Sequence, residues 1–169
     1  VAGITYEQSK WTWWNSTFFQ AKRLITVTNP AATQIFMNLT YDSSNTSNTH
    51  YIMPDCSDIR FTNSSENATL NYQIENYSLS SWCTVWVNVT PADNFYLYYN
   101  NKTAITSESM NTIWDSSFKT LHHMQEPSGN LTDDSQNTNN LVIANTVLYQ
   151  QGGKFGYGIN LSSSGIPYL

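Results

Sequence analysis

Short runs of alternating apolar and polar residues follow one another along the chain, and Asn, Asp, Ser or Pro bounds each run. This period of two residues predicts β-strands, because successive side chains of a strand point to opposite faces. The runs recur every roughly 10–15 residues, which favours an antiparallel β-sandwich with turns between the strands. The clearest runs are RLITVTN (23–29), QIFMNLTY (34–41), DIRFTN (58–63), LNYQIEN (70–76), CTVWVNVT (83–90) and NFYLYYN (94–100).

Helix signals are nearly absent. The one candidate is a turn or two within TSESMNTIWDSS (106–117), where Thr106 or Ser107 could cap the first turn. Beyond it the pattern predicts further strands, and Gly152 with Gly153 marks a turn. These strands are expected at LHHMQE (121–126), LVIANTVLYQ (141–150) and KFGYGINLS (154–162), with the polar loop GNLTDDSQNTNN (129–140) after the first of them.

The polar positions contain ten Asn-X-Ser/Thr sequons, the acceptor pattern for N-linked glycans. The chain has 20 Asn, 20 Ser and 20 Thr, so a random order would give about five sequons. We therefore expect most of the ten to carry glycan, against the alternative that they are incidental to a polar surface. The acceptors are Asn15, Asn38, Asn45, Asn63, Asn67, Asn76, Asn88, Asn101, Asn130 and Asn160.

The strand pattern also places acceptors on outward faces. In TVWVNVTP, three valines share one face, so Asn88 falls on the other face with Thr84, Trp86 and Thr90. In QIFMNLTY, the residues Ile35, Met37, Leu39 and Tyr41 are expected to face inward, which turns Asn38 outward. In GINLS, Ile159 and Leu161 flank an outward Asn160 in the same way. Outward placement leaves room for a glycan.

The composition argues against a nucleic-acid-binding protein and against a membrane-spanning helix. Only 11% of the residues are charged, against a usual ~25%, so solubility depends on hydroxyls, amides and, by this interpretation, glycans. The 24 aromatic residues supply a core, and the seven basic residues never form a run, which argues against nucleic-acid binding. No apolar run approaches the ~18 residues of a membrane helix. The chain begins at Val1, as a secreted, cell-surface protein would after signal-peptide removal.

The two cysteines, Cys56 and Cys83, lie 27 positions apart in a chain rich in expected strands. In a secreted β-protein we expect them to form a disulfide, although two buried free thiols are the alternative. Neither cysteine belongs to a CxxC or Cys/His pattern, so the sequence gives no sign of a zinc site.

Five blocks between Arg23 and Ser107 resemble, in order, a family known only as a domain of unknown function, which precedes laminin-G/concanavalin-A-like jelly rolls in archaeal and bacterial surface proteins. Asn100 replaces the Gly that the family usually has there, but Asn also tolerates positive φ. The remaining residues, 109–169, resemble the opening of the jelly roll, which would then be truncated. The blocks are RLITVTN (23–29), DIRFTN (58–63), LNYQIENY (70–77), TVWVNV (84–89) and YLYYNNKTA (96–104).

The resemblance implies a fold that is an all-β, Ig-like or jelly-roll-like sandwich, incomplete in itself and completed by a donor strand. We expect a donor tail at residues 1–12 and a single sandwich domain at 13–169, made of a family-like part (13–108) and a truncated jelly-roll part (109–169). In the tail, Ala2, Ile4 and Tyr6 share one strand face and would be the inserted anchors. A disordered N-terminus is the alternative.

Candidate chemical groups are few. His122, His123 and Glu126 are the densest set of possible metal ligands, but adjacent strand residues point to opposite faces, so no metal site is expected. Asp133 and Asp134 could bind calcium in a loop, although adjacent carboxylates in a turn are more often caps or solvated. No catalytic arrangement and no cofactor motif is present, so we expect no enzyme activity and no cofactor.

Two functions from different classes remain. The first is a structural subunit of an extracellular, N-glycosylated filament that polymerises head to tail with itself by donor-strand complementation; in this respect the chain is similar to the subunits of archaeal thread filaments. The second is a secreted carbohydrate-binding module whose exposed tryptophans stack on sugars, although tryptophans are more often core anchors. The six are Trp11, Trp13, Trp14, Trp82, Trp86 and Trp114.

Overall fold

The computed structural model describes residues 18–29, 31, 33–40, 52–91, 93–144, 147–154 and 156–161. The expected donor-strand residues, the acceptors Asn15 and Asn45, and the first three tryptophans therefore lie outside the described residues. The chain divides into two compact units between Ser109 and Met110, next to the part boundary expected at 108/109. The assignment of both parts to a single domain stays a prediction.

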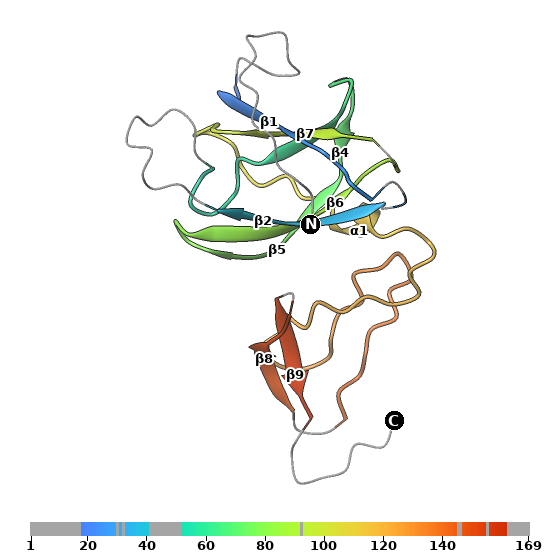
Figure 1. Ribbon diagram of the computed structural model, residues 1–169. Coiled ribbons are helices and arrows are strands. Elements are labelled where there is room, and N and C mark those ends of the chain that lie inside the picture. Colours follow the sequence, from blue (N-terminus) through green and yellow to red (C-terminus); the bar gives the residue numbers. More distant parts are fainter. Residues whose placement is uncertain are drawn as a thin grey trace. The chain divides into compact units, whose positions relative to one another are not determined.

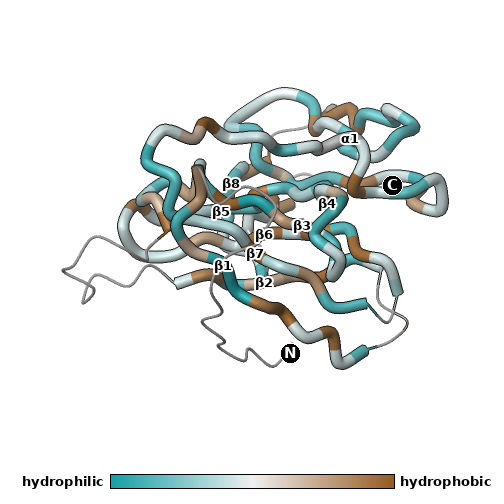
Figure 2. The backbone as a smooth tube through the Cα atoms, turned by 90° about the horizontal axis from the view of Figure 1, so that it is seen from above, coloured by the Kyte–Doolittle hydropathy of each residue, from teal (hydrophilic) through white to brown (hydrophobic). Residues whose placement is uncertain are grey.

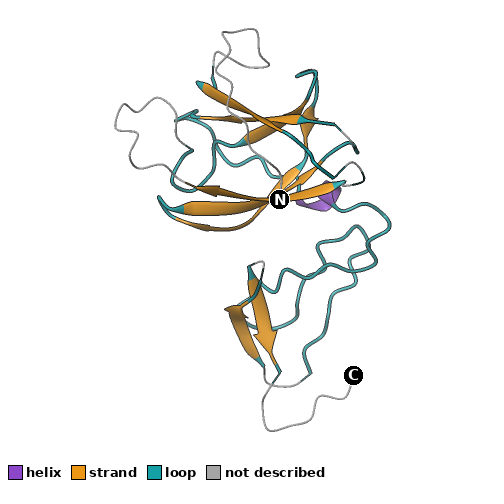
Figure 3. Cartoon of the chain, viewed as in Figure 1, coloured by secondary structure: helices purple, strands orange, loops and turns teal. Residues whose placement is uncertain are grey.

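The first unit is a β-sandwich of two antiparallel sheets, which lie face to face in Figure 1. One sheet has the order β1-β7-β3-β4 and the other the order β2-β6-β5. Loops and turns connect these strands among the residues that the structure describes (Figure 3). The predicted all-β, antiparallel sandwich is therefore confirmed, and its completion by a donor strand stays a prediction. The strands are β1 (Ala21–Ile25), β2 (Gln34–Thr40), β3 (Arg60–Asn63), β4 (Thr69–Leu70), β5 (Tyr72–Ser78), β6 (Trp82–Asn88) and β7 (Phe95–Tyr99).

Alternation of side chains sets the register of the three-stranded sheet. Figure 2 colours the described residues by hydropathy. In β6 every second residue is buried, ending with Val85 and Val87, which are both 0% exposed. Met37 and Leu39 of β2 lie opposite Val85 and Cys83 and are also buried, whereas Asn38 between them is exposed. The inward faces predicted for these strands are confirmed at Met37, Leu39 and the β6 valines, whereas Ile35 is only partly buried and Tyr41 lies outside the described residues.

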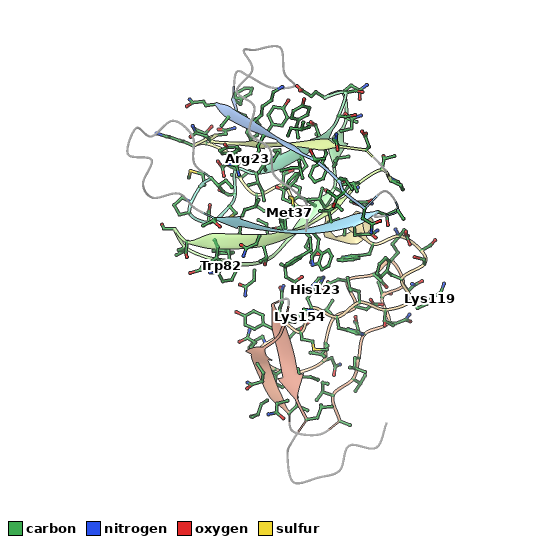
Figure 4. All side chains as sticks on the ribbon, in the orientation of Figure 1. Arg23, Met37, Trp82, Lys119, His123 and Lys154 are labelled. Carbon is green, nitrogen blue, oxygen red and sulfur yellow. A yellow bond between two sulfur atoms is a disulfide. The ribbon has the colours of Figure 1, made fainter. Side chains whose placement is uncertain are left out.

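Aromatic packing joins the two sheets. Phe61 of β3 contacts Tyr72 of β5 edge to face, with ring centroids 5.3 Å apart, and Phe95 of the same sheet lies 6.0 Å from Phe61. All three side chains are at most 2% exposed. Figure 4 shows Met37 among the side chains between the sheets. Burial of each such ring contributes about 2 kcal/mol to the stability of the unit.

A disulfide connects Cys56, just before β3, to Cys83 of β6, and thereby links the two sheets. The predicted pairing is confirmed. Beside it, the fully buried Asp58 accepts backbone N–H groups of Met53 (2.8 Å), Asn100 (2.6 Å) and Asn101 (3.3 Å). Burial raises the pKa of the Asp58 carboxyl despite these bonds. Asn100 has φ 63°, the positive value that the sequence reasoning allowed for.

The second unit contains one helical turn, α1 (Met110–Ile113), and a two-stranded sheet of β8 (Leu148–Gly152) and β9 (Tyr157–Asn160). The helical turn was expected, but it begins at Met110, past Thr106 and Ser107. Leu131 and Leu141 form an isolated bridge between two loops. In the described part of the chain, no helix is both long and apolar enough to span a membrane.

Two strand predictions in the second unit are wrong. Residues 121–126 form no strand, because Met124 has φ 57°, which breaks an extended backbone, and because the N–H of Leu121 donates to the Asp133 side chain instead of to a neighbouring strand. Residues 141–144 contribute only the bridge at Leu141, and the strand expected over 141–150 begins at Leu148. The N–H of Ile143 bonds instead to the side chain of Asn130, at 3.3 Å.

Candidate assembly surface and glycosylation sites

The β8–β9 hairpin is the most open element that the structure describes. In β8, four of the five residues are exposed, and Leu148 keeps 56% of its surface accessible to solvent. In β9, Tyr157 is 36% exposed and the following Leu161 is 46% exposed. Two-stranded hairpins are marginally stable in water, so a further strand on this sheet would stabilise it.

The apolar residues of β9 fall on one face. Tyr157, Ile159 and Leu161 are two residues apart, whereas Asn160 points to the other face. The sequence pattern predicted that Ile159 and Leu161 face inward. Ile159 is half-buried, but Leu161 is exposed, so this face is only partly covered. Among the described strands only β8 pairs with β9, and a strand edge beside such a stripe is a template for another strand.

Side chains of β8 attach the hairpin to its own unit. The Tyr149 hydroxyl donates to the carbonyl of Gly129 at 2.6 Å, and Nε2 of Gln150 donates to the carbonyl of Gln125 at 2.7 Å. Gln150 has φ 51°, and the register shifts between Leu148 and Gln151, so β8 is irregular. The regular strand β9 is therefore the better template for an added strand.

Asp133 organises the loops next to the hairpin. This carboxylate is 4% exposed, and its oxygens accept the N–H groups of Leu121 (2.8 Å), Ser135 (2.9 Å) and Asn139 (2.6 Å) and the Ser135 hydroxyl (2.9 Å). Burial raises the pKa of Asp133, but these hydrogen bonds outweigh it and hold the pKa far below its usual range. Asp133 therefore acts as a structural anion that fixes the loop.

The same contacts bear on whether Asp133 could bind calcium. The donors around Asp133 all point hydrogens at its oxygens, which leaves the carboxylate ill suited to a cation. Its neighbour Asp134 lies 3.8 Å from Nε2 of His123, and burial raises the Asp134 pKa while His123 opposes the shift. Across the described residues, no group of three or more His, Cys, Asp and Glu side chains could hold a metal ion.

The eight acceptor asparagines that the structure describes are all exposed or partly exposed. Asn38, Asn67, Asn130 and Asn160 are exposed, and Asn63, Asn76, Asn88 and Asn101 are partly exposed. Access to solvent is a requirement for modification, and glycosylation itself stays a prediction.

Some acceptors also have local structural roles. Oδ1 of Asn63 accepts the backbone N–H of Asn67 (3.1 Å), while Nδ2 of Asn63 donates to Oδ1 of Asn67 (2.7 Å), so the two amides close the turn between β3 and β4. Oδ1 of Asn101 accepts the N–H (3.1 Å) and hydroxyl (3.0 Å) of Thr103, its own sequon threonine. Those bonds do not use Nδ2 of Asn101, the atom that would take the sugar.

The outer face of the three-stranded sheet carries an aromatic pair. Phe36 of β2 lies opposite Trp86 of β6, with ring centroids 4.8 Å apart and planes tilted by 54°. The indole N–H of Trp86 donates to Oε2 of Glu75 in β5 at 3.2 Å, and Glu75 is 4% exposed. Trp82 of β6 is also partly exposed on this face (Figure 4).

Trp114 differs from these tryptophans. It is 3% exposed and packs against Phe118 and His123, with centroids 5.0 Å and 6.0 Å away, so it is a core anchor of the second unit. Sequence reasoning missed the structural roles of Asp133 and Glu75. For Asp133 a signal existed, because an Asp two residues before a Ser is typical of an Asx-turn.

The family match covers β3 to β7 of the sandwich and the loop that Asp133 organises. Residues 55–140 match the family described as "Domain of unknown function (DUF2341)". Neither a characterised protein nor a solved structure matches the chain. Since the matched residues make up half of its length, the chain belongs to this family of domains of unknown function.

Proposed function

We propose that the protein is a structural subunit of an extracellular, N-glycosylated filament, a thread-like or pilus-like homopolymer of the archaeal cell surface. The observation that carries the proposal is the open β8–β9 hairpin with its apolar stripe on β9. A head-to-tail contact that uses two different surfaces does not close on itself and therefore generates a filament.

The receiving surface is the edge of β9. A strand added there would form main-chain hydrogen bonds along Tyr157–Asn160 and would cover Tyr157, Ile159 and Leu161 with its own alternate side chains. Burying a side chain of this size contributes about 2 kcal/mol, so three of them contribute about 6 kcal/mol toward the cost of ordering the donor segment. The main-chain hydrogen bonds and the donor's own buried side chains add to this contribution. A glycan on Asn160 would lie on the opposite face and would leave the stripe accessible.

The donor is the segment Val1–Lys10 of the neighbouring copy. Its residues Ala2, Ile4 and Tyr6 alternate with polar ones, which matches the alternation of β9. The segment contains no sequon, so no glycan would obstruct insertion. Ten residues span up to ~33 Å when extended, which exceeds the length of β9.

Glycans at the acceptor sites would cover the other surfaces. A sugar coat blocks lateral strand pairing and proteolysis, and an acidic chain with few charges gains solubility from it. The proposal places the protein outside the cell, assigns it no catalytic activity or cofactor, and makes a second copy of the chain its partner.

Paired substitutions in the donor segment test this proposal. Ile4→Asp puts a charge on the inserted face, whereas Thr5→Asp puts the same charge on the outward face. We expect Ile4→Asp to give monomers and Thr5→Asp to give filaments by electron microscopy and sedimentation. Filaments of normal length from the Ile4→Asp chain would contradict the proposal.

A carbohydrate-binding module is the second candidate, and the partly exposed Phe36–Trp86 pair favours it. Aromatic rings on a sheet face are a common platform for free sugars. Glycan-array binding by the monomeric Ile4→Asp chain, lost on Phe36→Ala, would support this alternative. Filaments that bind no free glycan would instead support the structural role.

A further inference from the structure

The acceptor asparagines share an unexpected neighbour in the sequence. Half of the ten sequons have an aromatic residue two positions before the acceptor. Because 14% of the residues are aromatic, a chance arrangement would give one or two such sequons. The five pairs are Trp13 with Asn15, Phe36 with Asn38, Phe61 with Asn63, Trp86 with Asn88, and Tyr99 with Asn101.

The structure separates these pairs into two kinds. Phe61 is 0% exposed and Tyr99 is 8% exposed, so their rings belong to the core and cannot meet a glycan. Phe36 and Trp86 are partly exposed, and each lies on the outward face of its strand with its acceptor. Trp13 and Asn15 lie outside the described residues.

Strand geometry brings the ring and the acceptor together. Side chains two residues apart on a strand share a face and are about 7 Å apart, which is within reach of a sugar ring attached to the asparagine. Phe36, Asn38 and Thr40 form such a row on β2, and Trp86 and Asn88 form another on β6.

Pairing of the strands merges the two rows into one surface. Since β2 and β6 are antiparallel, Phe36 lies directly opposite Trp86, while Asn38 lies opposite Thr84 and Asn88 opposite Gln34. The two acceptors therefore flank the aromatic pair on opposite sides. The bond from Trp86 to the buried Glu75 fixes the orientation of the indole before any sugar arrives.

We propose that Phe36 and Trp86 bind the proximal sugar rings of the chain's own glycans on Asn38 and Asn88. The inference rests on the proposed glycosylation and adds the sites and the mode of binding. The C–H face of a pyranose packs on the face of an aromatic ring as apolar side chains do, while its hydroxyls stay in water. In this proposal the first sugars of both glycans pack against the Phe36–Trp86 pair.

Attachment uses a lipid-linked oligosaccharide phosphate as the donor. Nδ2 of the asparagine forms a bond to C1 of the first sugar and releases one proton to solvent, while the bond from C1 to the phosphate oxygen breaks and the lipid phosphate leaves with its electron pair. The rings take no part in this transfer and act on the product.

A double-mutant cycle on the full chain, produced in a glycosylating host, tests the inference. Thr40→Val removes the sequon of Asn38 without touching the acceptor, and Phe36→Val removes the ring while keeping a strand-forming residue. We expect Thr40→Val to lower the hydrogen-exchange protection of residues 34–40 about fivefold when Phe36 is present, the effect of losing one aromatic contact. In the Phe36→Val chain it should have no effect.

Two controls complete the design. Ser162→Ala removes the sequon of Asn160, which has Gly158 in place of an aromatic, and should leave exchange in β9 unchanged. Phe36→Tyr keeps a ring and should preserve the effect of Thr40→Val. Peptide mass spectrometry that finds Asn38 and Asn88 unmodified, or an equal effect of Thr40→Val with and without the ring, would overturn the inference. Neither readout depends on filaments, so electron microscopy of the same samples tests the filament proposal separately.

Discussion

Removal of the Cys56–Cys83 disulfide should destabilise the first unit strongly. The bond closes a loop with a sequence separation of 27 residues and joins the segment before β3 to β6 in the other sheet. In the chain-entropy model such a loop contributes about 3.5 kcal/mol at 25 °C by restricting the unfolded chain. A domain of this size is stable by about 5–15 kcal/mol in total, so the loss is a large fraction of it.

The assay is urea unfolding of the monomeric Ile4→Asp chain, with and without Cys56→Ala and Cys83→Ala. With a urea dependence of about 1.5–2 kcal/mol per molar, the midpoint should fall by about 2 M. Reduced protein with both cysteines is the matched control, because it keeps the side chains and lacks only the bond. A fall below about 0.5 M would refute the reasoning that the bond restricts a long, otherwise free loop.

Three further predictions concern buried polar groups. Asp58→Ala should lower the unfolding free energy by about 3 kcal/mol, since three backbone N–H groups lose their acceptor; a loss below 1 kcal/mol in urea unfolding would contradict it. Asn100→Ala should be about 1 kcal/mol less stable than Asn100→Gly by the same assay, because φ is 63°; equal stability would argue against that backbone. The pKa of Asp133 lies below its unfolded value, so its stabilisation is present above about pH 4 and lost in acid. Asp133→Asn should therefore flatten the loss of exchange protection at Leu121 below pH 4, and an unchanged profile would count against this role.

The strands of the first unit could be predicted well because short stretches of sequence specify them. In QIFMNLT the apolar residues alternate without interruption, and β2 spans those seven residues with Met37 and Leu39 buried. The same holds for β6, where the valines specify both the strand and its inward face. The disulfide could be predicted because the chain has two cysteines and the sequence pattern led us to expect a secreted β-protein.

The second unit could not be predicted in the same way, because contacts distant in sequence determine it. The apolar pattern of LHHMQE looks like a strand, yet Leu121 bonds to the carboxylate of Asp133, twelve residues later. The positive φ of Met124 has no signal in the residue type, since Met rarely adopts it. Where backbone N–H groups donate to side chains instead of to a neighbouring strand, the alternation of apolar and polar residues no longer predicts the secondary structure.

The Phe36–Trp86 pair could be predicted only in part. The sequence turned Trp86 and Asn88 outward, but the contact of Trp86 with Phe36 depends on the register of β2 against β6. The selection of Phe36 and Trp86 over Phe61 and Tyr99 as surface rings likewise required the burial of each side chain. Register and burial belong to the folded sheet, so local patterns alone do not specify them.

Deletion of Val1–Lys10 tests the central claim most directly. The truncated chain should remain folded, as its disulfide and the exchange protection of β6 would report, but should sediment as a monomer and form no filaments. A synthetic Val1–Lys10 peptide, added in excess, should then bind the truncated chain and protect the amides of β9, whereas a peptide with Ile4→Asp should not. Filaments that form without the segment, or a peptide that leaves β9 unprotected, would contradict the account.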